Sequence, residues 1–218
     1  MTHAGAPGGR DFFDCAKCGL LFLDPTRRPA PAEERARYEE HRNDPRDPGY
    51  RRFLERLLTP LVRRLAPGAE GLDFGCGPGP AMVPMLRARG FAAEGYDPFF
   101  APRRELLERR WDFVTCTEVI EHFHHPAREF EQLAGLVRPG GLLAVMTDPV
   151  TPVVDLASWY YLRDPTHVSL YRAETFRWIA EARGWSLERP DPRVAIFRVP
   201  RLSAPAAIPD VRADRSSP

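Results

Sequence analysis

Short apolar segments alternate with amphipathic ones along most of this chain. Each apolar segment has the length of a strand and each amphipathic one the length of a helix. The predicted strands are 71–74, 91–96, 111–117, 142–147, 185–189 and 194–199, and the predicted helices are 50–66, 79–89, 102–110, 126–138 and 173–183. Because strands buried on both faces pair in parallel and are joined by helices, this alternation predicts an α/β fold with a doubly wound, mostly parallel sheet.

Segments of a different character flank the alternating part. Residues 1–48 form a predicted N-terminal extension, in which 1–10 are disordered, a hairpin turns at Cys15–Gly19 and a charged helix covers 31–41. The alternating part is assigned to one domain over 49–202. Residues 203–218 are rich in Pro, Ala, Asp and Arg and are expected to form a disordered tail.

Charge and hydropathy exclude several classes of protein. The 218 residues include 31 Lys+Arg and 30 Asp+Glu, so we expect no nucleic-acid partner and no binding to an anionic membrane surface. No apolar run approaches the roughly 18 residues that a membrane span needs. The start of the chain has no apolar segment typical of a signal peptide, which favours a soluble cytoplasmic protein. The composition does not indicate an oligomeric state.

A glycine-rich loop follows the first strand of the predicted domain, with the residues Asp73-Phe74-Gly75-Cys76-Gly77-Pro78-Gly79-Pro80. A strand that leads through such a loop into a helix places backbone N–H groups beside a ligand. The third glycine of a dinucleotide fingerprint would stand where Pro80 stands, which disfavours a nicotinamide dehydrogenase. The G-x-G-x-G spacing with an acidic residue before it favours S-adenosylmethionine, although a Gly/Pro-rich turn without a ligand would have a similar sequence.

Asp97 ends the second predicted strand, about 20 residues beyond the glycine loop, where an acidic side chain commonly binds ribose hydroxyls. With these elements, the chain resembles the class I S-adenosylmethionine-dependent methyltransferases. The matching stretches are LDFGCGPGP (72–80), GYDPFF (95–100), WDFVTCTEVIEHF (111–123) and LVRPGGLLAVMT (136–147).

This resemblance implies a Rossmann-like methyltransferase domain over 49–202, with S-adenosylmethionine lying across the carboxyl ends of the first two strands. Only residues 98–110 separate Asp97 from the next strand, so we expect six or seven strands and assign no adenine contacts. The implied cofactor-binding residues are Asp73, Phe74, Gly75, Cys76, Gly77, Pro78, Gly79, Asp97, Pro98, Thr117 and Glu118.

The segment Glu118-Val119-Ile120-Glu121-His122 offers a candidate metal site. If the chain turns helical there, the spacing puts Glu118, Glu121 and His122 on one face, and His167 supplies a fourth ligand. This set is similar to the metal ligands of small-RNA 2′-O-methyltransferases, and its E-x-x-E-H part to ubiquinone-pathway O-methyltransferases. We therefore predict these four residues as catalytic and as ligands of Mg²⁺, Mn²⁺ or Zn²⁺. A cofactor contact for Glu118 and a structural role for His122 are the alternatives.

The N-terminal pair Cys15 and Cys18 looks like half of the zinc-knuckle segment that some bacterial methyltransferases carry. Structural zinc takes four ligands, and His3 and His41 are the candidates for the other two. Without them, the pair forms a hairpin that holds no metal, which is the default prediction. The sequence thus predicts methyl transfer to a small-molecule acceptor, more readily at oxygen than at carbon or nitrogen. The alternative function is a non-catalytic adaptor or sensor that binds S-adenosylmethionine.

Overall fold

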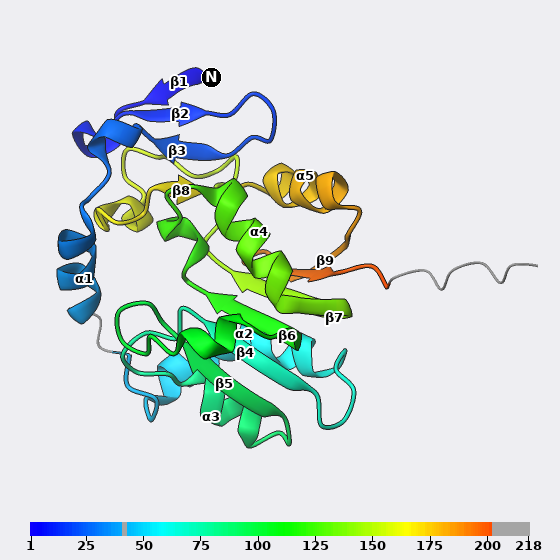
Figure 1. Ribbon diagram of the computed structural model, residues 1–218. Helices are drawn as coiled ribbons and strands as arrows, with labels where there is room; N and C mark the ends of the chain where they lie inside the picture. Colours follow the sequence, from blue (N-terminus) through cyan, green and yellow to red (C-terminus); the bar gives the residue numbers. More distant parts are fainter. Residues whose placement is uncertain (41–42, 202–218) are drawn as a thin grey trace, which may run out of the picture.

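The computed structural model describes residues 1–40 and 43–201. Its main sheet has six strands in the order β5–β4–β6–β7–β10–β9 (Figure 1). These strands are β4 (Glu70–Phe74), β5 (Ala92–Tyr96), β6 (Trp111–Thr117), β7 (Val137–Met146), β9 (Ser186–Asp191) and β10 (Val194–Arg198). The expected tail at 203–218 and His41 lie outside the described residues.

The first four strands of this sheet are parallel and the last two antiparallel. Strand β4 pairs in parallel with β5 and β6, and β6 pairs in parallel with β7. Strand β10 is antiparallel to both of its neighbours, β7 and β9. The sheet confirms the predicted α/β fold, with the lower of the two expected strand counts. Between β5 and β6 the chain forms only the short 3₁₀ helix Arg104–Leu107.

Helices cover both faces of the main sheet. On one face, α4 (Pro126–Leu136) and α5 (Ala173–Arg183) bury Phe130, Leu133 and Phe176 against β6 and β7. On the other face, α2 (Pro48–Val62) buries its leucines together with α3 (Met82–Arg87). The three- and four-residue spacing of these leucines is what turns one apolar side of α2 toward the sheet.

The N-terminal residues form a second sheet, which corrects the expectation that 1–10 are disordered. Its strand order is β1–β2–β3–β8, made of β1 (Thr2–Gly5), β2 (Phe12–Asp14), β3 (Leu21–Leu23) and β8 (Ser169–Leu170). Strand β8 comes from the second half of the chain, so the small sheet joins segments more than 140 residues apart. Its inner face packs Phe12, Leu21 and Leu23 against Val150, Tyr161 and Val168.

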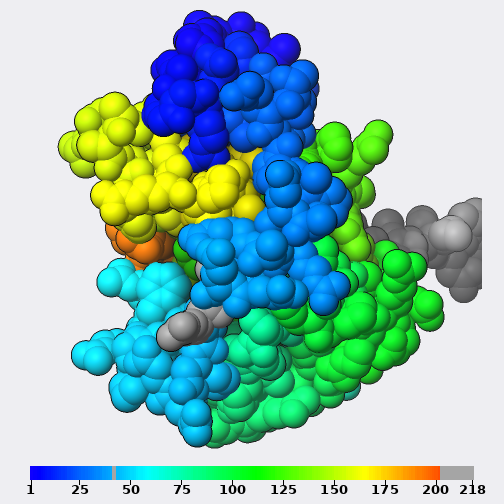
Figure 2. Space-filling view, turned by 90° about the vertical axis from the view of Figure 1, so that its left-hand side faces the viewer, coloured from blue at the N-terminus to red at the C-terminus, as the bar shows by residue number. Residues whose placement is uncertain are grey.

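Helix α1 (Pro31–Glu39) descends from this small sheet along one side of the molecule (Figure 1). In the view of Figure 2 it lies over the middle of that face, between the yellow segment around residues 150–170 and the green segments below it. An ion pair from Arg37 Nε to Asp164 (2.9 Å) and a hydrogen bond between His124 Nε2 and Glu34 (2.9 Å) hold it there. The N-terminal part of the chain therefore packs on the face where the carboxyl ends of the parallel strands lie.

No helix in the described part of the chain is both long enough and apolar enough to cross a membrane.

The packing of the small sheet predicts unequal effects for two neighbouring phenylalanines. Phe12 is fully buried, whereas Phe13 is half-buried on the other face of its strand. Phe12→Ala should lower the free energy of unfolding by about 3–5 kcal/mol through the cavity it leaves. Phe13→Ala should lower the free energy of unfolding by clearly less, because its side chain is only half-buried. Urea denaturation measures both, and equal losses would contradict the assignment of the inner face.

Candidate active site

The glycine loop folds tightly at the carboxyl end of β4. Gly75 and Gly77 have φ values of +76° and +64°, which side chains rarely adopt. The N–H groups of Gly75 and Cys76 both donate to the Tyr96 carbonyl, at 2.8 and 3.1 Å. A Cβ atom on Gly75 would come within 2.4 Å of the Val119 side chain. Glycine at 75 thus lets the loop pack directly against the segment that follows β6.

Asp97 ties three parts of this loop region together. Its Oδ2 accepts a hydrogen bond from the N–H of Gly77 (3.0 Å), and its Oδ1 accepts from Phe99 (2.8 Å) and Phe100 (3.0 Å). Charged acceptors make stronger hydrogen bonds than neutral ones. The Asp97 carboxylate therefore fixes both the glycine loop at Gly77 and the turn that follows β5 at Phe99 and Phe100. The ribose contact of Asp97 stays a prediction, and what the structure shows is that its side chain shapes the loop.

Asp73, a predicted cofactor contact, packs against the neighbouring strand β6. It is buried beneath the loop, 4% exposed, and accepts a hydrogen bond from Thr115 Oγ1 at 2.7 Å. Burial raises its pKa to about 7, against the lowering effect of the Thr115 hydroxyl. Helix α3 also starts at Met82 and not at 79, and Gly79 lies against the carbonyl oxygen of Asn43. Neither Asp73 nor Gly79 lines the cavity described next.

A cavity of about 770 Å³ opens beside the loop. Parts of the chain that are distant in sequence line it, including α1, the glycine loop, the end of β5, the segment after β6 and the 3₁₀ helix Tyr160–Arg163. The predicted cofactor residues that line it are Phe74, Gly75, Cys76, Gly77, Pro78, Asp97, Pro98, Thr117 and Glu118. The volume lies within the range of small-molecule sites, and the candidate metal ligands line the same space.

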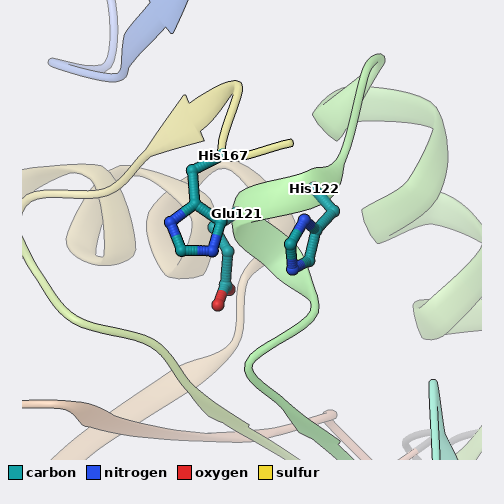
Figure 3. Close-up of side chains that lie close together, drawn as sticks. All are labelled: Glu121, His122 and His167. Carbon is teal, nitrogen blue, oxygen red and sulfur yellow. The ribbon is translucent and has the colours of Figure 1, made fainter. Parts of the chain in front are cut away.

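Three of those candidates form a compact group. One ligand atom from each of Glu121, His122 and His167 lies within 4.8 Å of the other two. Figure 3 shows the Glu121 carboxylate between the two imidazole rings, with Glu121 and His122 on one short helical turn and His167 on a separate segment. Glu121 is fully buried, and its Oε2 has no hydrogen-bond partner.

Both histidines are oriented by backbone carbonyls. His122 Nδ1 lies 3.1 Å from the Thr166 oxygen, and His167 Nδ1 lies 2.6 Å from the Tyr161 oxygen. A carbonyl oxygen only accepts, so in the neutral imidazole Nδ1 carries the proton and Nε2 carries the lone pair. This is the arrangement in which protein histidines bind metal ions through Nε2.

Glu118 is not a member of this group. The expected helical face would start at Glu118, but the 3₁₀ helix starts only at Ile120. Glu118 has a φ of +53°, the only positive φ of a non-glycine residue within the described ranges, and its N–H donates to the Met146 carbonyl at 2.8 Å. This backbone conformation is strained for a residue with a side chain. The carboxyl group still lines the cavity, and its buried Oε1 has no hydrogen-bond partner.

Burial dominates the electrostatics of the two carboxyl groups. It raises the pKa of Glu121 to about 7, and it raises that of Glu118 well above its usual value, with the nearby Glu121 adding to the effect. Arg193, the cation that acts on Glu118, lies 3.3 Å from Asp148 in an ion pair. A bound cation would stabilise both carboxylates in their ionised form.

Sequence reasoning missed the contribution of α1 to this cavity. The rings of Tyr38 and His122 form a T-shaped pair with centroids 5.0 Å apart, and Tyr38 also packs against Phe99. Glu34 lines the cavity beside His124, and burial raises its pKa to about 7. Nothing in the spacing of α1 distinguishes these two residues from an ordinary charged helix.

The Cys15–Cys18 hairpin forms as predicted, between β2 and β3. In the part of the chain that the structure describes, the group around Glu121 is the one place where three ligand-type side chains gather. The candidate supplement His3 lies 2.9 Å from Asp11 Oδ1. The described residues therefore give Cys15 and Cys18 no further zinc ligands.

The fold and the loop define a protein that holds a nucleoside-containing ligand at the carboxyl edge of a parallel sheet. The chain belongs to a family described as a methyltransferase domain, whose model matches residues 46–189. It is a class I S-adenosylmethionine-dependent methyltransferase.

Among curated proteins, the chain is similar to the ubiquinone biosynthesis O-methyltransferase of Aeromonas salmonicida (strain A449). The two are 33% identical over a region that covers 37% of this chain and 43% of that protein. The chain thus spans less than half the length of this relative.

Two solved structures share the fold. One is the magnesium protoporphyrin IX methyltransferase of Synechocystis PCC 6803 with bound SAH, at 20% identity and a TM-score of 0.52, covering 71% of this chain and 84% of that one. The other is phosphoethanolamine N-methyltransferase 2 of Haemonchus contortus with S-adenosyl-L-methionine, at 18% identity and a TM-score of 0.53, covering 72% and 43%. At these identities the likeness concerns the fold.

The buried Asp73 predicts a pH-dependent stability. Because its folded-state pKa of about 7 lies above the unfolded value, the folded chain binds more protons in between, and stability falls as pH rises from about 4 to 7. Asp73→Asn removes this fall. Denaturation at several pH values without cofactor should show the stability of the variant gaining on wild type by up to about 1.4 kcal/mol per pH unit. Parallel plots of stability against pH for wild type and Asp73→Asn would contradict the raised pKa of Asp73.

Asp97→Asn should weaken binding of S-adenosylhomocysteine. The substitution removes the charge and one of the two acceptor oxygens that fix Gly77 and Phe99. A bond to a charged group contributes about 1.5–3 kcal/mol, so we expect a loss of at least roughly tenfold in affinity. Titration calorimetry measures the loss, and circular dichroism controls for folding. Unchanged affinity would contradict the role of Asp97.

Proposed function

We propose that this protein transfers the methyl group of S-adenosylmethionine to a hydroxyl oxygen of a small-molecule acceptor. We further propose that a divalent cation bound by Glu121, His122 and His167 assists the transfer. One observation carries the metal assignment: both imidazoles donate Nδ1–H to backbone carbonyls beside a buried carboxylate whose Oε2 lacks a hydrogen-bond partner.

The donor set fits a divalent transition metal. Two imidazole nitrogens and one carboxylate oxygen suit Zn²⁺, Mn²⁺ or Fe²⁺ better than Mg²⁺, which prefers oxygen ligands. Three protein ligands leave coordination positions for the acceptor. Glu118 lines the same cavity and would add negative charge beside the cation without being one of the three ligands.

A bound cation would lower the pKa of the acceptor hydroxyl and hold its oxygen toward the methyl group. The chain itself supplies the positions of the two reactants. The glycine loop and Asp97 hold the cofactor on one side of the cavity, and the Glu121 group lies in the wall of the same cavity. Methyl transfer needs in-line alignment of the two reactants, so this shared cavity provides the main catalytic effect of the protein.

The size and the lining of the cavity favour a small acceptor. Helix α1 lies along the cavity and contributes Glu34, Arg37 and Tyr38 to its wall. Transfer to oxygen is supported by the name of the Aeromonas salmonicida relative, an O-methyltransferase. The family match in turn favours an enzyme over a non-catalytic adaptor.

Removing the cation or one ligand should abolish methyl transfer but not cofactor binding. A mixture of alcohols, phenols and amines is incubated with isotope-labelled S-adenosylmethionine, and mass spectrometry shows whether the label is on oxygen, nitrogen or carbon. We expect labelling to fall at least about 100-fold with a chelator and in Glu121→Gln, because a metal contributes several kcal/mol to the barrier. Added Mn²⁺ or Zn²⁺ should restore wild type after chelation, but not the variant.

Calorimetry with S-adenosylhomocysteine is the control, and its affinity should stay the same in Glu121→Gln. Full labelling in the presence of the chelator would contradict the metal assignment. Label that appears only on nitrogen or carbon acceptors would contradict O-methylation.

A further inference from the structure

Tyr161 lies in the 3₁₀ helix Tyr160–Arg163 and contacts two of the three members of the Glu121 group. It is 5% exposed, so its hydroxyl needs partners inside the protein. The two contacts are made by different parts of the residue, the side chain and the backbone.

The side chain of Tyr161 fixes Glu121. Its hydroxyl donates to Glu121 Oε1 at 2.5 Å, a short hydrogen bond. The Tyr161 hydroxyl oxygen also lies 2.9 Å from Thr147 Oγ1 and accepts a hydrogen bond from the N–H of Asp148 at 3.3 Å. With Oε1 engaged in this way, Oε2 is the Glu121 oxygen that has no hydrogen-bond partner.

The hydroxyl also discriminates between the two buried carboxyl groups. A phenol has one proton to donate, and Glu118 Oε2 is 3.3 Å away, farther than Glu121 Oε1. The shorter contact takes the proton. Glu121 is therefore held more closely by this hydroxyl than Glu118 is.

The backbone and the ring of Tyr161 fix His167. The Tyr161 carbonyl accepts the hydrogen bond from His167 Nδ1 at 2.6 Å, and the two rings pack with their centroids 4.0 Å apart. The carbonyl sets the tautomer of His167 and the ring sets its tilt. One residue thereby orients a carboxylate and an imidazole that come from separate segments.

We propose that Tyr161 is the positioning residue of the cation site, which aligns Glu121 through its hydroxyl and His167 through its carbonyl and ring. This inference rests on the function proposed above. Tyr161 does not touch the cation. It reduces the conformational freedom that two of the three ligands would lose when the cation binds.

The test compares Tyr161→Phe with Tyr160→Phe in the full chain. The first variant keeps the ring and the carbonyl but loses the hydroxyl that holds Glu121. The control lies on the same helical turn, and its hydroxyl bonds to Asp148, which is outside the ligand group. The readout is titration with Co²⁺, whose visible absorption reports both affinity and coordination geometry.

We expect Tyr161→Phe to weaken Co²⁺ binding by about 10–100-fold and to change the absorption spectrum, as loss of a partner behind a metal ligand does. Tyr160→Phe should bind Co²⁺ like wild type, and both variants should bind S-adenosylhomocysteine like wild type. Thr147→Val, which removes a neighbour of the Tyr161 hydroxyl, should show a smaller loss and covers the case in which Tyr161→Phe does not fold.

Equal Co²⁺ affinity and spectra in wild type, Tyr161→Phe and Thr147→Val would overturn the positioning role alone. Failure of the wild-type protein to bind Co²⁺ would overturn the proposed cation site and this inference with it. The two failures are therefore distinguishable.

Discussion

The register of three parallel strands controls where the chemistry of this protein can take place. Asp73 of β4 pairs with Thr115 of β6, and Thr117 of β6 pairs with Met146 of β7, so the three strands end at one level. The glycine loop, the Glu118–His122 segment and the chain after β7 therefore leave the sheet side by side. This edge is where open α/β sheets bind their ligands. A shift of one strand would separate the cofactor loop from the Glu121 group.

Carboxyl groups gather at that edge with little to compensate them. Glu121 is fully buried there and Glu118 is half-buried, and each has one buried oxygen without a hydrogen-bond partner. Burying a charge in this way is costly unless a cation or enough donors accompany it. The N-terminal sheet and α1 pack on this side of the molecule, and α1 contributes to the wall of the cavity. In the proposed function a bound cation compensates this charge, and Tyr161 orients two of its three ligands.

Local signals in the sequence predicted the glycine loop after β4 and Asp97 at the end of β5, which the structure places side by side. The glycine loop and Asp97 are each encoded within a few residues, because turn chemistry depends on neighbours along the chain. The lower strand count could also be predicted from the sequence. Residues 98–110, between β5 and β6, are too few for a further strand and its crossover helix. The hydrogen bond between Asp73 and Thr115 could not be predicted in this way, because the two residues are 42 positions apart.

The contacts that complete the site could not be predicted in this way. Tyr161 meets Glu121 across 40 residues, and α1 meets Asp164 across 127. Such contacts depend on the small sheet, in which β3 pairs with the two-residue strand β8. A strand this short has no recognisable pattern. The positive φ of Glu118 could not be predicted either, because no neighbouring residue in the sequence requires that conformation.

A crystal structure with S-adenosylhomocysteine and Mn²⁺, recorded at a wavelength where manganese scatters anomalously, tests the central claim most directly. The account predicts one anomalous peak within bonding distance of Glu121, His122 and His167, with the cofactor sulfur facing the same cavity. A cofactor bound in the glycine loop with no peak at these three side chains would contradict it.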